Sequence, residues 1–205
     1  MAEAVTRYFP YSQREIDYLQ TRDAELGEAI ARIGRVERAV MPDLFTAMVH
    51  AVVGQLISAQ AADTILTRLK EAVGEITPAH VAAKGAEAIQ RCGLTKNKAM
   101  CLASIADSVV RGEWSLEQLR SMPDEAAIEA LTGWKGIGRW TAEMVLLHGL
   151  ERPDVVSWGD AAIRRGMMKL YGLSSLTRDE FEMYRQRYAP HGSIASIYLW
   201  EISFH

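Results

Sequence analysis

Residues 131–147, LTGWKGIGRWTAEMVLL, contain three glycines within six positions, and apolar segments with helical spacing lie on both sides. The segment before them, PDEAAIEALTG, ends at Gly133, which predicts a helix closed by a left-handed cap. A second helix is predicted to begin near Gly138 or Arg139 and to run to about His148. The short connection WKGIG therefore predicts a tight helical hairpin.

Helical spacing recurs along most of the sequence. Residues 44–57 place apolar side chains at i, i+3 and i+4, which predicts one mostly buried helix beginning at Pro42 or Asp43. Another helix is predicted to end at Gly74, and shorter ones follow up to Gly133. Alternation typical of β-strands is confined to RPDVVSW, which is too short to anchor a sheet. The prediction is an all-α fold of about ten helices.

Composition excludes several other classes of protein. About half of the 205 residues are apolar, which suffices for one core or two small ones. No apolar run approaches the roughly 20 residues that span a bilayer, and the N-terminal residues lack the pattern of a signal peptide. We therefore expect a cytoplasmic protein without membrane contact. Cys92 and Cys101 are too few for a four-cysteine zinc site or an iron–sulfur cluster, and we interpret them as ordinary thiols.

The charge of the chain is unevenly distributed. A net charge of −3 argues against a basic coat for general nucleic-acid binding. Residues 131–187, however, hold nine Lys and Arg against seven Asp and Glu, whereas residues 41–130 hold eight against eleven. The hairpin segment is therefore the part of the chain better suited to attract an anion.

The glycines of the hairpin favour a phosphate ligand but do not require one. Gly136 and Gly138 have no Cβ atom, so the backbone there can lie close to another surface. The N–H groups and the positive end of the next helix suit a phosphate, and Lys135 and Arg139 add positive charge. Glycine turns between helices also occur as plain packing devices, so both interpretations stay open at this point.

The segment resembles the helix-hairpin-helix motif of base-excision DNA glycosylases. The resemblance is carried by Trp134, Gly136, Ile137, Gly138, Thr141 and Ala142, with Trp134 and Lys135 replacing the usual Leu and Pro. It implies that a DNA phosphate is bound by Lys135, Gly136, Gly138, Arg139 and Thr141. It also implies a structural Na⁺ or K⁺ ion on the backbone carbonyls of Thr132, Trp134 and Gly136, while catalysis needs no cofactor.

The resemblance extends over nearly the whole chain. It implies a compact member of the family that lacks the N-terminal β-sheet domain of some bacterial relatives. By that analogy, residues 41–149 form a helical barrel that bears the hairpin, and residues 1–40 together with 150–205 form a second helical subdomain. The two subdomains would flank a cleft that contains Asp160.

Asp160 follows Trp140 by twenty positions and precedes a predicted helix, AAIRRGMMKLYG. Asp is a favoured N-cap residue, so capping alone is one interpretation. The position also resembles that of the catalytic aspartate in the 3-methyladenine DNA glycosylase II branch. Cleavage of an N-glycosidic bond builds positive charge on the sugar, which a fixed carboxylate stabilises. Trp140 stands where bifunctional members have a lysine, which implies an enzyme without lyase activity.

The resemblance assigns a wedge and a base pocket as well. An enzyme that acts on a base in a duplex must extrude it and fill the gap. Gln55 and Leu56 match the gap-filling segment, although the helical phase of Leu56 equally predicts a core position. Trp140, Met144 and His191 match positions that line the base pocket, where an aromatic face attracts cationic alkylated purines. Trp140 as a core residue and His191 as a surface loop residue stay open.

The function implied by the resemblance is excision of alkylated purines, of the 3-methyladenine and 7-methylguanine type, in base excision repair. The partner would be double-stranded DNA that contains damaged bases, and the enzyme would act as a monomer. One alternative is a non-catalytic helix-hairpin-helix module that binds DNA, and another is a helical protein with no nucleic-acid role. Asp160 separates the enzyme from the binding module, because both need the hairpin and only the enzyme needs the carboxylate.

Overall fold

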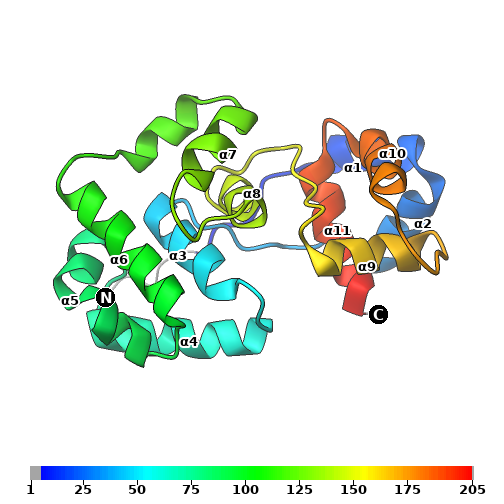
Figure 1. Ribbon diagram of the computed structural model, residues 1–205. Helices are drawn as coiled ribbons and strands as arrows, with labels where there is room; N and C mark the ends of the chain where they lie inside the picture. Colours follow the sequence, from blue (N-terminus) through cyan, green and yellow to red (C-terminus); the bar gives the residue numbers. More distant parts are fainter. Residues whose placement is uncertain (1–5, 205) are drawn as a thin grey trace. The chain divides into compact units, whose positions relative to one another are not determined.

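The computed structural model describes residues 6–204, and helices dominate this part of the chain (Figure 1). Residues 6–204 form eleven α-helices, one 3₁₀ helix and no β-strand beyond an isolated bridge between Tyr8 and Ala39. The predicted all-α fold is therefore confirmed. The helices are α1 Gln13–Arg22, α2 Ala24–Ile33, α3 Leu44–Gly54, α4 Ala59–Val73, α5 Pro78–Arg91, α6 Lys96–Val110, η1 Leu116–Ser121, α7 Asp124–Thr132, α8 Arg139–His148, α9 Ala161–Leu170, α10 Arg178–Tyr188 and α11 Gly192–Phe204.

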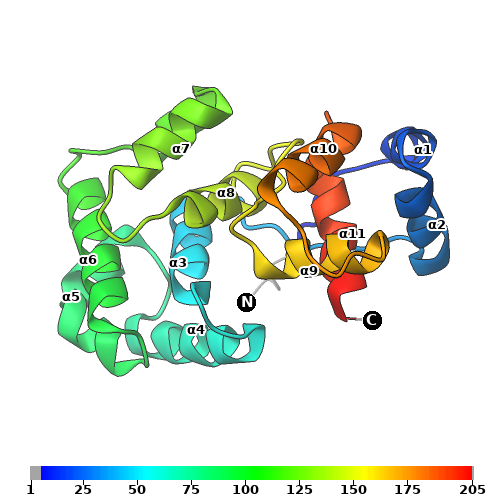
Figure 2. The same ribbon diagram turned by 45° about the vertical axis from the view of Figure 1, so that its right-hand side comes forward.

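The described chain divides into two compact units. The first unit combines the residues up to Val40 with those from Glu151 onward, and it holds α1, α2 and α9 to α11. The second unit runs from Met41 to Leu150 and holds α3 to α8 with η1. Within the second unit, α5 and α6 lie side by side, as Figure 1 and Figure 2 both show.

Helix α3 is the central helix of the second unit and packs against α4, α6, α8 and η1. Apolar residues occupy nearly all of its faces, and most are buried, as expected for a helix surrounded by others. It begins as predicted, with Asp43 as N-cap accepting a 2.7 Å hydrogen bond from the backbone N–H of Thr46. It ends at Gly54, however, so the expectation that the buried helix continues to residue 57 is wrong. Leu56 and Ile57 lie beyond its end and are exposed.

The hairpin lies between α7 and α8, and α8 has the predicted bounds. The left-handed cap expected at Gly133 is not observed, because this residue continues the helical path with φ −60° and ψ −22°. Its N–H donates to the carbonyl oxygen of Glu129, so the helical hydrogen-bond pattern continues through Gly133. The left-handed residue is Gly136, with φ +100°. The reversal thus occurs three residues later than the cap pattern indicates.

The first unit is built around α11, whose residues are almost all buried, and α9 packs closely along it. The contact is closest at Gly166, where an added Cβ would overlap the carbonyl oxygen of Leu199. Asp23 ties α2 to this core: its buried carboxylate accepts hydrogen bonds from Tyr171 Oη (2.7 Å) and from Arg187 Nη1 (3.1 Å). Buried charges are stable only when paired in this way.

Both cysteines are buried and unlinked, and burial raises the pKa of Cys101 to about 11. Among residues 6–204, no cluster of three or more His, Cys, Asp or Glu side chains is arranged to hold a metal ion. No helix in this range has the length and apolar character needed to cross a bilayer.

Candidate functional site

The two hairpin glycines have different roles in the structure. Gly136 adopts φ +100°, which L-residues with a side chain rarely adopt. A Cβ at this position would lie 3.2 Å from Cβ and 3.3 Å from Sγ of Cys101 on α6. The packing interpretation therefore accounts for Gly136 without any ligand.

Gly138 is not explained by packing. It is the N-cap of α8 with φ −93° and ψ 171°, a conformation open to any residue, and no described atom outside its chain neighbours lies within 4 Å of where its Cβ would be. No side chain caps α8 either. The first N–H groups of a helix have no partner within the helix, and their dipoles add up to a partial positive charge. These features of the α8 N-terminus are compatible with an anion ligand.

Three side chains assigned to the phosphate differ in how accessible they are. Lys135 is exposed in the hairpin loop. Arg139 is already engaged, because its guanidinium donates two hydrogen bonds to Glu125 (2.6 and 3.0 Å) and one to Glu143 (3.0 Å). The bonds to Glu125 are the main reason that the pKa of Arg139 is raised. Thr141 is buried, and its Oγ1 accepts a hydrogen bond from Gln55 Nε2 (2.9 Å).

The two residues assigned to the wedge differ in the direction of their side chains. Gln55 turns toward the hairpin, where Nε2 donates to the Gly136 carbonyl oxygen (2.9 Å) and to Thr141 Oγ1 (2.9 Å). Leu56 turns outward with its side chain fully exposed and adopts φ +56°. The core position that the helical phase of Leu56 predicts is wrong, because α3 ends before it. Of the two, Leu56 projects into solvent, whereas Gln55 is hydrogen-bonded to the hairpin.

Trp140 and Met144 lie one turn apart on α8 and so share a face of the helix. Met144 is buried, whereas Trp140 is partly exposed, and its Cη2 lies 3.9 Å from the position that a Cβ on Gly54 would occupy. Trp140 therefore has contacts inside the second unit and also an accessible surface.

Asp160 is the N-cap of α9, as the sequence predicts for one of its two interpretations. Its Oδ1 accepts hydrogen bonds from the backbone N–H groups of Ala162 (2.9 Å) and Ile163 (3.0 Å), and the residue is 8% exposed. Capping fixes the carboxylate in one orientation. It does not conflict with catalysis, since a charge that stabilises a transition state must be held in place.

Two neighbours of Asp160 are not predicted from the sequence. The first is Arg38, whose pKa depends on the charge of Asp160. Burial lowers the pKa of Arg38, while the charge of Glu201 and, to a smaller extent, that of Asp160 raise it. Arg38 also lies over the Trp200 ring, 4.9 Å from its centre. No signal in the sequence could connect positions so far apart.

The other neighbour is Trp158, two positions before Asp160. The guanidinium groups of Arg164 and Arg178 lie 5.0 and 5.3 Å from the centre of its ring, and Arg164 also donates to its carbonyl oxygen. Two cationic side chains therefore lie within cation–π distance of the Trp158 ring in the segment that leads into α9.

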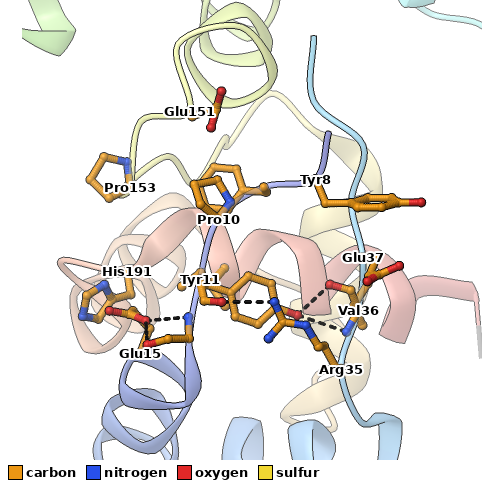
Figure 3. Close-up of a pocket in the computed structure, with 13 residues that line it drawn as sticks. Tyr8, Pro10, Tyr11, Glu15, Arg35, Val36, Glu37, Glu151, Pro153 and His191 are labelled. Atoms are coloured by element: carbon orange, nitrogen blue, oxygen red, sulfur yellow. Dashed lines mark hydrogen bonds between the residues drawn. The ribbon is translucent and has the colours of Figure 1, made fainter. Parts of the chain in front are cut away.

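His191 lines an open cavity of about 780 Å³ in the first unit (Figure 3). Its ring makes an edge contact with Tyr18, with 5.0 Å between ring centres, and Glu15 lies beside it. All lining residues come from segments 8–15, 35–37, 151–153 and 191–194. None of Trp140, Met144 and Asp160 lines this cavity, so it does not decide between the base pocket and a surface loop for His191.

Two of the three hairpin carbonyls assigned to a monovalent ion already accept hydrogen bonds. The Trp134 carbonyl accepts a hydrogen bond from the N–H of Ile137 (3.0 Å), and that of Gly136 accepts the one from Gln55. Each carbonyl oxygen has two lone pairs, so these hydrogen bonds do not prevent Trp134 and Gly136 from also binding a cation. The Trp134 ring packs against Trp114 at 5.2 Å between centres, which gives the bulky residue at this position a structural role.

Comparison with known proteins identifies relatives along most of the sequence. Residues 49–191 match the family described as HhH-GPD superfamily base excision DNA repair protein. DNA-3-methyladenine glycosylase 1 of Schizosaccharomyces pombe is 33% identical over 76% of this chain and 71% of its own length. A crystal structure of DNA-3-methyladenine glycosidase from Bacillus halodurans has 31% identity and a TM-score of 0.79, covering 96% of this chain and 92% of that one. The structure of the S. pombe 3-methyladenine DNA glycosylase in complex with abasic DNA has 29% identity and a TM-score of 0.83, covering 92% and 95%.

Proposed function

Because this chain belongs to the HhH-GPD superfamily of base excision DNA repair proteins, we propose that it is a monofunctional glycosylase that excises alkylated purines from double-stranded DNA. The relatives named above are 3-methyladenine DNA glycosylases, which supports this substrate class. The observation that carries the proposal is the presence in one chain of an uncapped helix N-terminus after Gly138 and a buried, oriented carboxylate at Asp160.

The proposed chemistry places one charge beside the sugar. As the N-glycosidic bond breaks, positive charge develops on the deoxyribose, and the Asp160 carboxylate stabilises that charge more than the neutral ground state. The same carboxylate can orient the attacking water. Its two hydrogen bonds from the α9 backbone hold it ready, so little reorganisation is needed during the reaction.

The other residues would supply recognition. The N–H groups at the start of α8 and Lys135 bind a backbone phosphate, and Leu56 fills the gap that the extruded base leaves. The electron-rich face of Trp140 attracts a cationic alkylated base, by about 0.5–2 kcal/mol. A monovalent ion on the hairpin carbonyls, when bound, would add positive charge near that phosphate.

The proposal predicts base release without strand cleavage. Incubation with duplexes that each carry one lesion should release 3-methyladenine or 7-methylguanine and leave an intact abasic strand. Borohydride should trap no covalent adduct, because Trp140 has no amine to attack the sugar. A trapped adduct would contradict the monofunctional assignment. Binding to every duplex without any base release would favour a non-catalytic DNA-binding module.

Gly138→Glu is expected to weaken binding to duplex DNA by about tenfold or more, because a carboxylate would stand where a phosphate binds. The fold should tolerate it, since the space around Gly138 is open. Ala83→Glu is a matched control, because it adds the same charge at an exposed position on α5. Fluorescence anisotropy with a labelled duplex measures both affinities. Equal affinities for the two variants would mean that the hairpin does not contact DNA.

A further inference from the structure

The loop that carries Leu56 has a strained backbone. Leu56 has φ +56°, a left-handed conformation that residues with a Cβ disfavour. Its side chain is fully exposed, so burial of apolar surface does not compensate for the strain. A strained residue persists only where its surroundings fix the backbone. Residues 55–57 are called the wedge loop below.

Lys98 holds the backbone immediately before Leu56. From α6, its Nζ donates to the carbonyl oxygen of Val53 (2.9 Å) and to that of Gln55 (2.7 Å). These are among the carbonyls at the end of α3, which have no partner within the helix, and an ammonium group forms strong hydrogen bonds with them. Burial lowers the pKa of Lys98, so the ammonium group has given up water to make these contacts.

Gln55 fixes the wedge loop from the other side. Its side-chain amide donates to Gly136 in the hairpin and to Thr141 in the first turn of α8, both at 2.9 Å. Gln55 thus accepts a hydrogen bond from Lys98 through its backbone carbonyl and donates two to the hairpin and α8 through its side chain. Wedge loop, hairpin and α6 are joined through two side chains within the second unit.

We propose that Lys98 and Gln55 are positioning residues, which hold Leu56 outward and in register with the phosphate-binding hairpin so that it enters the duplex as the damaged base leaves. This inference rests on the proposed function, because it assigns Leu56 the role of wedge. A positioning role differs from a purely structural role in the reaction step that it affects. Loss of either residue should impair the opening of a paired duplex more than the chemical step.

The test compares one lesion in two settings with the intact chain. Single-turnover release of 7-methylguanine is measured from a fully paired duplex and from an unpaired bulge, where little opening is needed. Lys98→Met should slow release from the paired duplex by about tenfold and from the bulge by less than about threefold. Lys96→Met is the matched control, since it removes the same charge from an exposed position on α6 and should leave the ratio of the two rates unchanged.

Two further measurements keep the test decisive. Gln55→Leu removes the bonds to the hairpin and leaves the Lys98 bonds to the backbone, so it should show the same selective loss even if Lys98→Met folds poorly. Hydrogen exchange at residues 54–57 should accelerate by about tenfold in Lys98→Met and stay unchanged in Lys96→Met.

The outcomes separate this inference from the proposed function. Wild-type rate ratios in both Lys98→Met and Gln55→Leu, with unchanged exchange in the wedge loop, would overturn the positioning role. Faster exchange confined to the wedge loop in a protein that releases no base from either substrate would support the positioning of Leu56 and overturn the glycosylase assignment.

Discussion

Asp160→Asn is expected to slow base release by about 100-fold or more while duplex affinity and stability stay close to those of the wild type. Asn keeps the shape of the side chain and an oxygen that can accept from Ala162 and Ile163, and it is as good an N-cap as Asp. What it removes is the negative charge. The substitution therefore separates the two interpretations of this residue, a helix cap and a transition-state stabiliser.

The measurement is single-turnover release from a lesion-containing duplex, with anisotropy for binding and denaturant unfolding for stability. Asp43→Asn is the matched control, because Asp43 caps α3 in the same way through a bond from Thr46. That variant should release base at the wild-type rate. If Asp160→Asn also released base at the wild-type rate, the carboxylate would act only as a helix cap. The proposed catalytic role of Asp160 would then be wrong.

Features of the site that depend on local sequence were predictable. The bounds of α8 and the cap at Asp160 follow from apolar spacing and from residues that favour helix ends. The end of α3 was not predictable from apolar spacing, because Leu56 and Ile57 continue the helical pattern. The carbonyls at its end are bound by Lys98, a residue from another helix, and apolar spacing carries no trace of this contact.

Charge pairing between distant positions limited the prediction further. Arg139 is positive and close to the hairpin, which predicts a phosphate contact, but its ion pair with Glu125 on α7 could not be predicted. Arg38 lies within electrostatic reach of Asp160 through the fold of the first unit alone. Spacing arguments find residues on one helix face, whereas pairs such as these depend on how helices pack.

Gly166→Ala is expected to lower the free energy of unfolding by about 3 kcal/mol, even though alanine favours helix over glycine. The new Cβ would overlap the carbonyl oxygen of Leu199 and lie 2.8 Å from its carbonyl carbon. Both atoms belong to the backbone of the buried helix α11, which cannot move aside without repacking the first unit. Helix α9 would have to shift instead, and Asp160 at its N-terminus would shift with it.

Gly54→Ala provides the comparison within a helix that has room. A Cβ there meets only the end of the Trp140 side chain, at 3.9 Å, an ordinary contact distance. Its stability should stay within about 1 kcal/mol of the wild type. Urea unfolding followed by circular dichroism measures both variants. Equal stability of Gly166→Ala and Gly54→Ala would show that α9 can move away from α11 at no cost in stability. Close packing at Gly166 would then not be what positions the helix that carries Asp160.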